Sequence, residues 1–145
     1  MKIHLDFDEE LLIKRIKQGS PLLFGIALEN DGIFYPAKNW IDFGVVIIGW
    51  WFQVAAKLSR EQTRSQLRFM DGPYLIEVSY DGQKMTVAFE PDGLDVIWHT
   101  SIEEFRRELI NAANVIANKF SQMNIDTESQ ITLKQAVILL ESTVA

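Results

Sequence analysis

Three Asp-Gly pairs, at residues 71–72, 81–82 and 92–93, recur about every ten residues in the middle of the chain. Asp-Gly is a strong signal for a tight β-hairpin turn, because both residues tolerate the positive φ angles that such turns require. Between the pairs, apolar and polar residues alternate, which is typical of strands with one buried and one solvated face. Residues 65–100 are therefore predicted to form an antiparallel β-meander.

The register of this meander follows from the expected loop lengths. Two-residue loops at 71–72 and 81–82, and a four-residue loop over 90–93, place apolar residues opposite one another on every strand. A slip of one residue would move each apolar set to the solvent face, so the pattern favours this register. The predicted apolar pairs are Leu67 with Ile76, Phe69 with Tyr74, Tyr74 with Phe89, Ile76 with Val87, Val78 with Met85, Met85 with Trp98, Val87 with Val96 and Phe89 with Leu94.

Before the meander, the chain shows a strand, a short helix and a hairpin. Residues 2–7 alternate apolar and polar side chains, which indicates a strand. Asp8 is the expected N-cap of a helix that stops near Gly19. Residues 30–32, Asn-Asp-Gly, lie between two apolar runs and predict a hairpin turn.

Residues 40–58 are predicted to form a central helix with Asn39 as its N-cap. Its side chains are apolar most of the way round, which is typical of a helix that is covered on more than one side. Gly44 and Gly49 weaken it as an isolated helix and are interpreted as points of close packing. The pair Trp50-Trp51 is expected to pack in the core rather than to form a ligand platform.

Two amphipathic helices are expected after the meander. Thr100 or Ser101 caps the first, and Glu103 or Glu104 completes a capping box. The apolar stripe of this helix comprises Ile102, Phe105, Leu109, Ala112, Ile116, Phe120 and Met123. The second helix opens at Thr127 and Gln130, and its stripe comprises Leu133, Ala136, Val137 and Leu140.

These elements predict an α+β fold. With 145 residues, of which 48% are hydrophobic, the chain has the size and composition of a single domain with one core. The expected arrangement is one domain over residues 1–145, in which an antiparallel β-meander sheet is packed on one face by helices, in two layers.

Charge and composition exclude several classes of function. The chain has no cysteine, so it forms no disulfide, thiolate zinc site or cysteine nucleophile. Its net charge of −6 argues against general binding to nucleic acids or anionic membranes, which requires a basic surface. The longest uncharged apolar run, residues 43–56, is shorter than a membrane span, and the acidic N-terminus is unlike a signal peptide. We therefore expect a soluble, cytoplasmic protein.

The chain offers few groups for catalysis. Its two histidines, His4 and His99, lie on the polar sides of predicted strands and are interpreted as surface residues rather than as metal ligands. No nucleophile elbow, phosphate-binding glycine loop or zinc-binding His-Glu-x-x-His is present. The acids Asp71, Asp81 and Asp92 are explained as turn residues. We expect no enzyme activity, no metal and no cofactor.

Negative charge is concentrated in the meander. Residues 71–100 carry six acids and one base, a net −5, so the remainder of the chain sums to −1. Solvated turns and edge strands explain part of this bias. The alternative is an electronegative face that attracts a basic partner. The residues predicted to bind such a partner are Glu77, Asp81, Glu90, Asp92, Asp95 and His99.

Four short motifs lie between the first hairpin and the second strand of the meander. They are Tyr35-Pro36, Trp40-x-Asp42-Phe43, Val45-Val46-x-x-x-Trp50-Trp51 and Phe69-Met70-Asp71-Gly72-Pro73-Tyr74. This pattern resembles a family of small bacterial immunity proteins, which are encoded beside toxins of polymorphic or contact-dependent growth-inhibition systems. The similarity runs from the hairpin before the central helix to near Met123.

The resemblance implies a non-enzyme that binds and neutralises one cognate toxin domain by occlusion. Such toxins are often nucleases with basic clefts, and the expected partner is a basic C-terminal fragment of a large secreted protein. The chain itself is expected to be a monomer or a weak homodimer. The alternative is a small-ligand-binding or adaptor module of the same fold, which would show a concave pocket with a few convergent polar groups. A carboxylate enzyme would instead show acids with shifted pKa values in a cleft.

Overall fold

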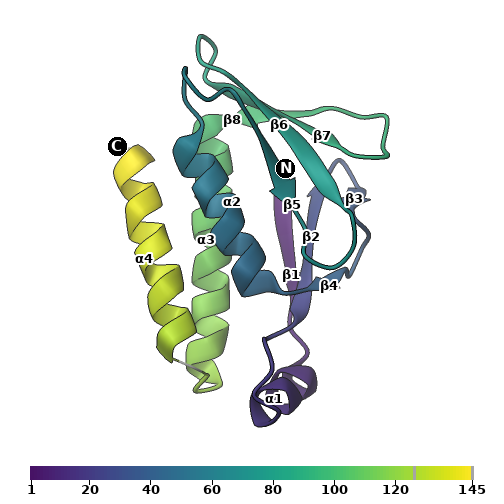
Figure 1. Ribbon diagram of the computed structural model, residues 1–145, viewed down its shortest axis with the longest axis vertical. Helices are drawn as coiled ribbons and strands as arrows, with labels where there is room; N and C mark the ends of the chain where they lie inside the picture. The colour runs from purple at the N-terminus through teal and green to yellow at the C-terminus, as the bar shows by residue number, and fades with distance from the viewer. Residues whose placement is uncertain (126, 145) are drawn as a thin grey trace.

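The computed structural model describes residues 1–125 and 127–144, and Figure 1 shows how its elements are arranged. Two antiparallel sheets and four helices make up these residues, so the predicted α+β class is confirmed. In chain order the elements are β1 (Lys2–Asp6), α1 (Glu9–Lys17), β2 (Phe24–Asn30), β3 (Ile33–Tyr35), β4 (Ile41–Asp42), α2 (Gly44–Lys57), β5 (Arg64–Arg68), β6 (Leu75–Asp81), β7 (Thr86–Pro91), β8 (Trp98–Ser101), α3 (Ile102–Gln122) and α4 (Thr127–Val144).

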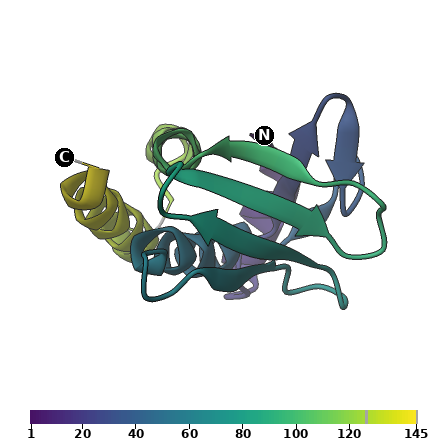
Figure 2. The same ribbon diagram turned by 90° about the horizontal axis from the view of Figure 1, so that it is seen from above.

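The strands form two four-stranded sheets. The meander runs in the order β5-β6-β7-β8, as the Asp-Gly spacing predicts. Figure 2 shows its strands side by side. The predicted N-terminal strand and hairpin are also present, as β1, β2 and β3. They join the short strand β4, which pairs with β2, in a second sheet that we call the N-terminal sheet. The sequence pattern did not separate this sheet from the meander.

Helices α2, α3 and α4 lie side by side, with α4 on the outside (Figures 1 and 2). Helix α2 contacts both sheets through β2 and β5, and α3 contacts β1, β7 and β8. One hydrophobic core, which includes residues of both sheets and of these helices, joins the layers. The largest side chains that are completely or almost completely buried are Trp51, Phe24, Phe89, Phe105 and Phe120.

The register of the first hairpin in the meander is confirmed. Leu67 pairs with Ile76, and Phe69 N donates to Tyr74 O at 3.1 Å. The two-residue loop predicted at 81–82 is wrong, because Asp81 pairs with Thr86 and residues 82–85 form the loop. Val78 therefore lies opposite Phe89 instead of Met85, and Tyr80 instead of Ile76 lies opposite Val87.

The loop predicted over 90–93 is also too short. Phe89 pairs with Trp98 instead of Leu94, and Val87 pairs with Thr100 instead of Val96. Both errors displace one strand by four residues. Because side chains alternate, an even displacement keeps every residue on its predicted face, so the apolar pattern does not distinguish the two registers. Met85 and Leu94 are the exceptions, because both lie in loops. Met85 has a φ of 54° and is 58% exposed, and Leu94 is 39% exposed.

The central helix begins later than residue 40. Ile41 and Asp42 pair with Gly25 and Phe24 of β2, so they extend a sheet before α2 starts at Gly44. The predicted N-cap Asn39 is wrong, because Phe43 occupies the N-cap position and Asn39 lies before β4 with a φ of 64°. Within α2 the expected burial holds for Trp51 but not for Trp50, which is 39% exposed.

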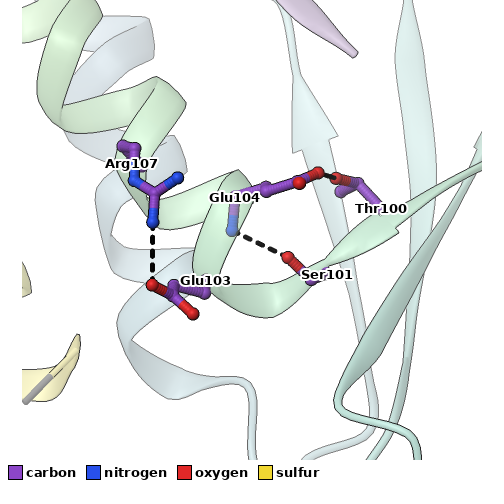
Figure 3. A network of polar contacts seen from close by, with 5 residues as sticks. All are labelled: Thr100, Ser101, Glu103, Glu104 and Arg107. Carbon is purple, nitrogen blue, oxygen red and sulfur yellow. Dashed lines mark hydrogen bonds and ion pairs between the residues drawn. The ribbon is translucent and has the colours of Figure 1, made fainter.

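Helix α3 starts at the Ser101 cap that its sequence indicates, and the Glu104 side chain bonds to Thr100 instead of completing the predicted capping box (Figure 3). Ser101 is the N-cap, and its Oγ accepts from Glu104 N at 3.0 Å. The Glu104 carboxylate in turn accepts from the Thr100 hydroxyl at 2.7 Å. One turn later, Arg107 pairs with Glu103 at 2.7 Å. These contacts fix the end of β8 to the start of α3.

The two glycines of α2 provide a matched pair of substitutions. A Cβ at Gly44 would lie 2.0 Å from the Phe24 ring, whereas a Cβ at Gly49 would meet nothing within 4 Å. Gly44→Ala should therefore destabilise the fold by about 1–3 kcal/mol through overpacking. Gly49→Ala should stabilise it by about 0.5–1 kcal/mol, because alanine favours helix. Urea denaturation midpoints measure both changes, and a shift of both variants in one direction would contradict the predicted packing.

Candidate functional site

The outer face of the meander carries the charged side chains that alternation predicts. Gln66 on β5, Glu77 on β6 and Glu90 on β7 stand in one row across three strands. Glu77 and Glu90 are direct cross-strand partners, and like charges in this position are destabilising. The row therefore concentrates negative charge at the middle of the sheet.

The loop between β7 and β8 adds two more acids beside this row. Asp92 N donates to Leu75 O at 3.0 Å, which attaches the start of the loop to β6. Leu94 N donates to Pro91 O at 3.1 Å and closes a turn around Gly93, whose φ is 84°. This turn places Asp92 and Asp95 next to the carboxylates of β6 and β7.

Four of the six predicted binding residues line one open depression of about 440 Å³. It contains the carboxylates of Glu77, Glu90, Asp92 and Asp95, and its lining includes no basic residue. Apolar side chains accompany the acids, because the loop also contributes Leu94, Val96 and Ile97. Ile97 is 54% exposed. The sequence placed these apolar residues on strand positions and so did not assign them to a site. We call this depression the acidic site.

A short relay of hydrogen bonds connects the acidic site to a base. Gln66 Nε2 donates to Glu77 Oε1 at 2.7 Å, and Arg68 Nη2 donates to Gln66 Oε1. All three side chains lie on the outer face of β5 and β6. The relay fixes the orientation of Glu77, while the guanidinium remains on the edge strand instead of entering the depression.

The two other predicted residues lie elsewhere. Asp81 is at the opposite end of β6, where its Oδ1 accepts from Gln83 N at 3.0 Å and Lys84 N at 3.3 Å. This carboxylate therefore caps the β6–β7 turn. His99 is exposed on β8, opposite Ala88, and is not among the residues that line the acidic site.

The end of the meander near Asp81 has a different charge from the acidic site. A shallow depression of about 690 Å³ is lined there by Arg60 and Arg64, together with Asp81 and polar residues. Arg64 is paired with Ser79 on the same outer face that carries Glu77. The face is thus predominantly acidic around Glu77 and Glu90, with Arg68 at its edge on β5, and predominantly basic at the other end of β6.

The motifs that carry the family resemblance meet at a buried carboxylate. Asp42 is completely buried, and its side-chain oxygens accept from Phe43 N at 2.7 Å and from Trp40 Nε1 at 3.0 Å. Asp71 N, which lies 29 positions further along the chain, is 3.1 Å from both oxygens. The Trp-x-Asp-Phe and Met-Asp-Gly-Pro-Tyr motifs are therefore two halves of one junction between the sheets.

Aromatic rings surround this junction. Tyr74 packs edge-to-face on Trp40 with ring centroids 5.0 Å apart, and on Tyr35 at 5.9 Å. Trp51 packs on Phe69 at 5.3 Å, and its Nε1 donates to Arg68 O at 3.0 Å. The resembling motifs thus build the scaffold beside the acidic site and do not line it.

Tyr35 connects the junction to the acidic site. Its hydroxyl accepts from Leu75 N at 3.2 Å, at the start of the strand that carries Glu77. Burial raises the pKa of the Tyr35 phenol above its ordinary value, the hydrogen bond from Leu75 opposes this, and the negative charge of Asp92 adds to the increase. The phenol therefore remains protonated at neutral pH.

Residues 1–125 and 127–144 offer no metal site and no membrane-spanning helix. No group of three or more histidines and acids there is arranged to hold a metal ion. His4 and His99 lie in different sheets. None of the helices in residues 1–125 and 127–144 is long and apolar enough to cross a membrane.

Comparisons with protein-family models, with curated proteins and with solved structures found no match to this chain.

Asp42→Ala tests the junction. The substitution leaves the donors of Asp71, Phe43 and Trp40 without their acceptor, and we expect a loss of about 2–4 kcal/mol in the free energy of unfolding. As a control, Asp95→Ala removes an exposed carboxylate and should change the free energy of unfolding by less than about 0.5 kcal/mol. Chemical denaturation of both variants measures the difference, and equal losses would show that the junction is not needed for stability.

Tyr35 is expected to make the free energy of unfolding depend on pH in the alkaline range. Its pKa in the folded protein lies above that of the unfolded chain, so the folded state holds the phenol proton more tightly. This contribution is fully present below about pH 10 and is lost as the pH rises through the folded pKa. Tyr35→Phe should flatten the alkaline fall in unfolding free energy. An unchanged fall in the variant would assign the effect to other groups.

Proposed function

We propose that this chain is an immunity protein, a non-enzyme that binds a cognate toxin domain and neutralises it by occlusion. One observation carries the proposal. Four carboxylates gather in a single depression on the outer face of the meander, with no base among the residues that line it. A basic toxin surface, such as the substrate cleft of a nuclease, has the complementary charge. The motif resemblance supports the same class of protein.

The acidic site has the makeup of a protein-binding surface. Its acids provide charge for long-range attraction, and exposed Leu94 and Ile97 provide apolar area beside them. The direct pairing of Glu77 with Glu90 leaves a repulsion in the free protein. An arginine or lysine of the partner placed between the two carboxylates would relieve this repulsion. The relief would then contribute favourably to the free energy of binding.

The arginines at the other end of β6 would orient the partner. Consider a toxin with an acidic rim next to its basic cleft. In one orientation only, its cleft faces the acidic site while its rim faces the arginines. Like charges in the reversed orientation disfavour the complex. Arg60 and Arg64 are therefore proposed to set the docking direction, while the acidic site supplies the main attraction.

The partner can be identified with the protein as bait. The tagged chain is added to a lysate of the source bacterium that expresses the neighbouring genes, and the retained proteins are identified by mass spectrometry. We expect one stoichiometric partner, a basic C-terminal fragment of a large secreted protein, held at moderate salt. Its toxin activity should be lost in the complex. A lysate that yields no such partner would contradict the proposal.

Charge reversal tests the placement of the interface. Glu90→Lys, Asp92→Lys and Asp95→Lys together should weaken binding to the captured toxin by at least about a hundredfold, because close charge pairs across interfaces contribute several kcal/mol. The dissociation constant is measured by calorimetry or biosensor.

The matched control reverses three exposed acids outside both depressions of the meander, Glu10, Glu103 and Glu141. It changes the net charge by the same amount, and therefore isolates position from total charge. Equal weakening by both triple variants would place the interface elsewhere and leave only general electrostatic attraction. Retained affinity in the Glu90, Asp92 and Asp95 variant would exclude the acidic site as the toxin contact.

A further inference from the structure

A third cavity lies on the solvent-facing side of the N-terminal sheet, away from the acidic site. Its volume is about 440 Å³, and it lies where the chain leaves β3 and returns at β4. Strand β2 pairs with β3 from Leu28 onward and with β4 up to Gly25, so residues 36–40 belong to neither partner strand. Ile26 N donates to Trp40 O at 2.7 Å and closes this segment against β2.

The floor of the cavity is made of very small residues. Gly25 and Ala27 of β2 lie on the solvent-facing side of the sheet, opposite Asp6 and His4, yet Ala27 is only 2% exposed. A Cβ at Gly25 would lie 2.9 Å from the Cβ of Asp6, so a larger residue does not fit there without moving β1. The surrounding side chains therefore stand above the floor and enclose it.

Opposite charges stand on the two sides of this floor. Asp6 comes from β1, and Lys38 and Asn39 come from the segment beyond the other edge of β2. Among the residues that the structure describes, no ion pair joins Asp6 to Lys38. Lys38 instead lies over the Phe34 ring, with Nζ 5.8 Å from its centroid.

Aromatic side chains close one end of the cavity. The His4 and Phe34 rings are tilted against each other with centroids 5.0 Å apart. The His4 imidazole is also held by Glu29, with Nε2 and Oε1 3.4 Å apart. This end therefore offers an aromatic wall beside the two charged sides.

We propose that this cavity binds a small zwitterion of the α-amino acid class, with its ammonium group at Asp6 and its carboxylate at Lys38 and Asn39. The charged sides flank β2 at a separation of two strand spacings, about 10 Å. That span accommodates a small molecule with a hydrogen bond of about 3 Å at each end. A simple anion or cation would satisfy only one of the two sides, whereas a zwitterion satisfies both.

The experiment is a titration of the full ¹⁵N-labelled chain, followed by amide chemical shifts. The probes are glycine, leucine and phenylalanine, with acetate and methylamine as ligands that each carry one charge. For at least one amino acid we expect saturable shifts at the amides of Asp6, Ala27 and Asn39, with a dissociation constant of about 0.1–1 mM. Acetate and methylamine should bind at least about tenfold more weakly.

Variants locate the binding. Asp6→Asn and Lys38→Gln should each weaken it about tenfold or more, because each removes a charged hydrogen bond. Asp31→Asn and Lys84→Gln make the same changes at exposed turn positions and should leave it unchanged. Ala27→Leu fills the floor and should abolish binding, with circular dichroism to verify its fold.

Three results would overturn the proposal. They are no saturation by any amino acid at about 10 mM, acetate affinity equal to that of the amino acids, and binding that survives both Asp6→Asn and Lys38→Gln. None of them bears on toxin binding, because the acidic site lies on the other sheet.

Discussion

The buried carboxylate of Asp42 holds the two sheets of this protein in one arrangement. A buried charge is costly unless hydrogen bonds replace its hydration, and here backbone and indole donors from both sheets do so. The bond from Asp71 N places the first turn of the meander against β4, and Tyr35 then binds the start of β6. The positions of the acidic site and of the helix layer follow from this attachment.

This arrangement separates the groups that build the protein from the groups available for binding. The motifs of the family resemblance contribute Tyr35, Trp40, Asp42 and Trp51 to the junction, where these side chains hydrogen-bond to other residues of the chain. The acids of the β7–β8 loop and of the middle strands face outward, and so does the floor of the cavity on the N-terminal sheet. Changes on either outer face therefore leave the hydrogen bonds of the junction intact.

Sequence patterns predicted elements and faces better than positions. Local chemical signals predicted the meander, the hairpin at 30–32 and the capping of α3 at Ser101. The start of α2 was not predicted correctly, because Asp42 resembles an acid of the first helical turn and its partner Asp71 is distant in sequence. For the acidic site, the charge pattern identified the four acids Glu77, Glu90, Asp92 and Asp95, together with Asp81 and His99, which lie elsewhere. The loop that adds Leu94 and Ile97 depends on a register that alternation does not distinguish.

That ambiguity of register also affects how such a surface evolves. The loops at 82–85 and after Pro91 join neighbouring strands of the meander. When one strand is displaced along the other, each side chain keeps its side of the sheet if the displacement is an even number of residues. Insertions or deletions that keep this parity reshape the outer edge while every core residue stays inward. The meander can therefore lengthen, shorten or re-aim its charged rim in pairs of residues with no compensating change in the core.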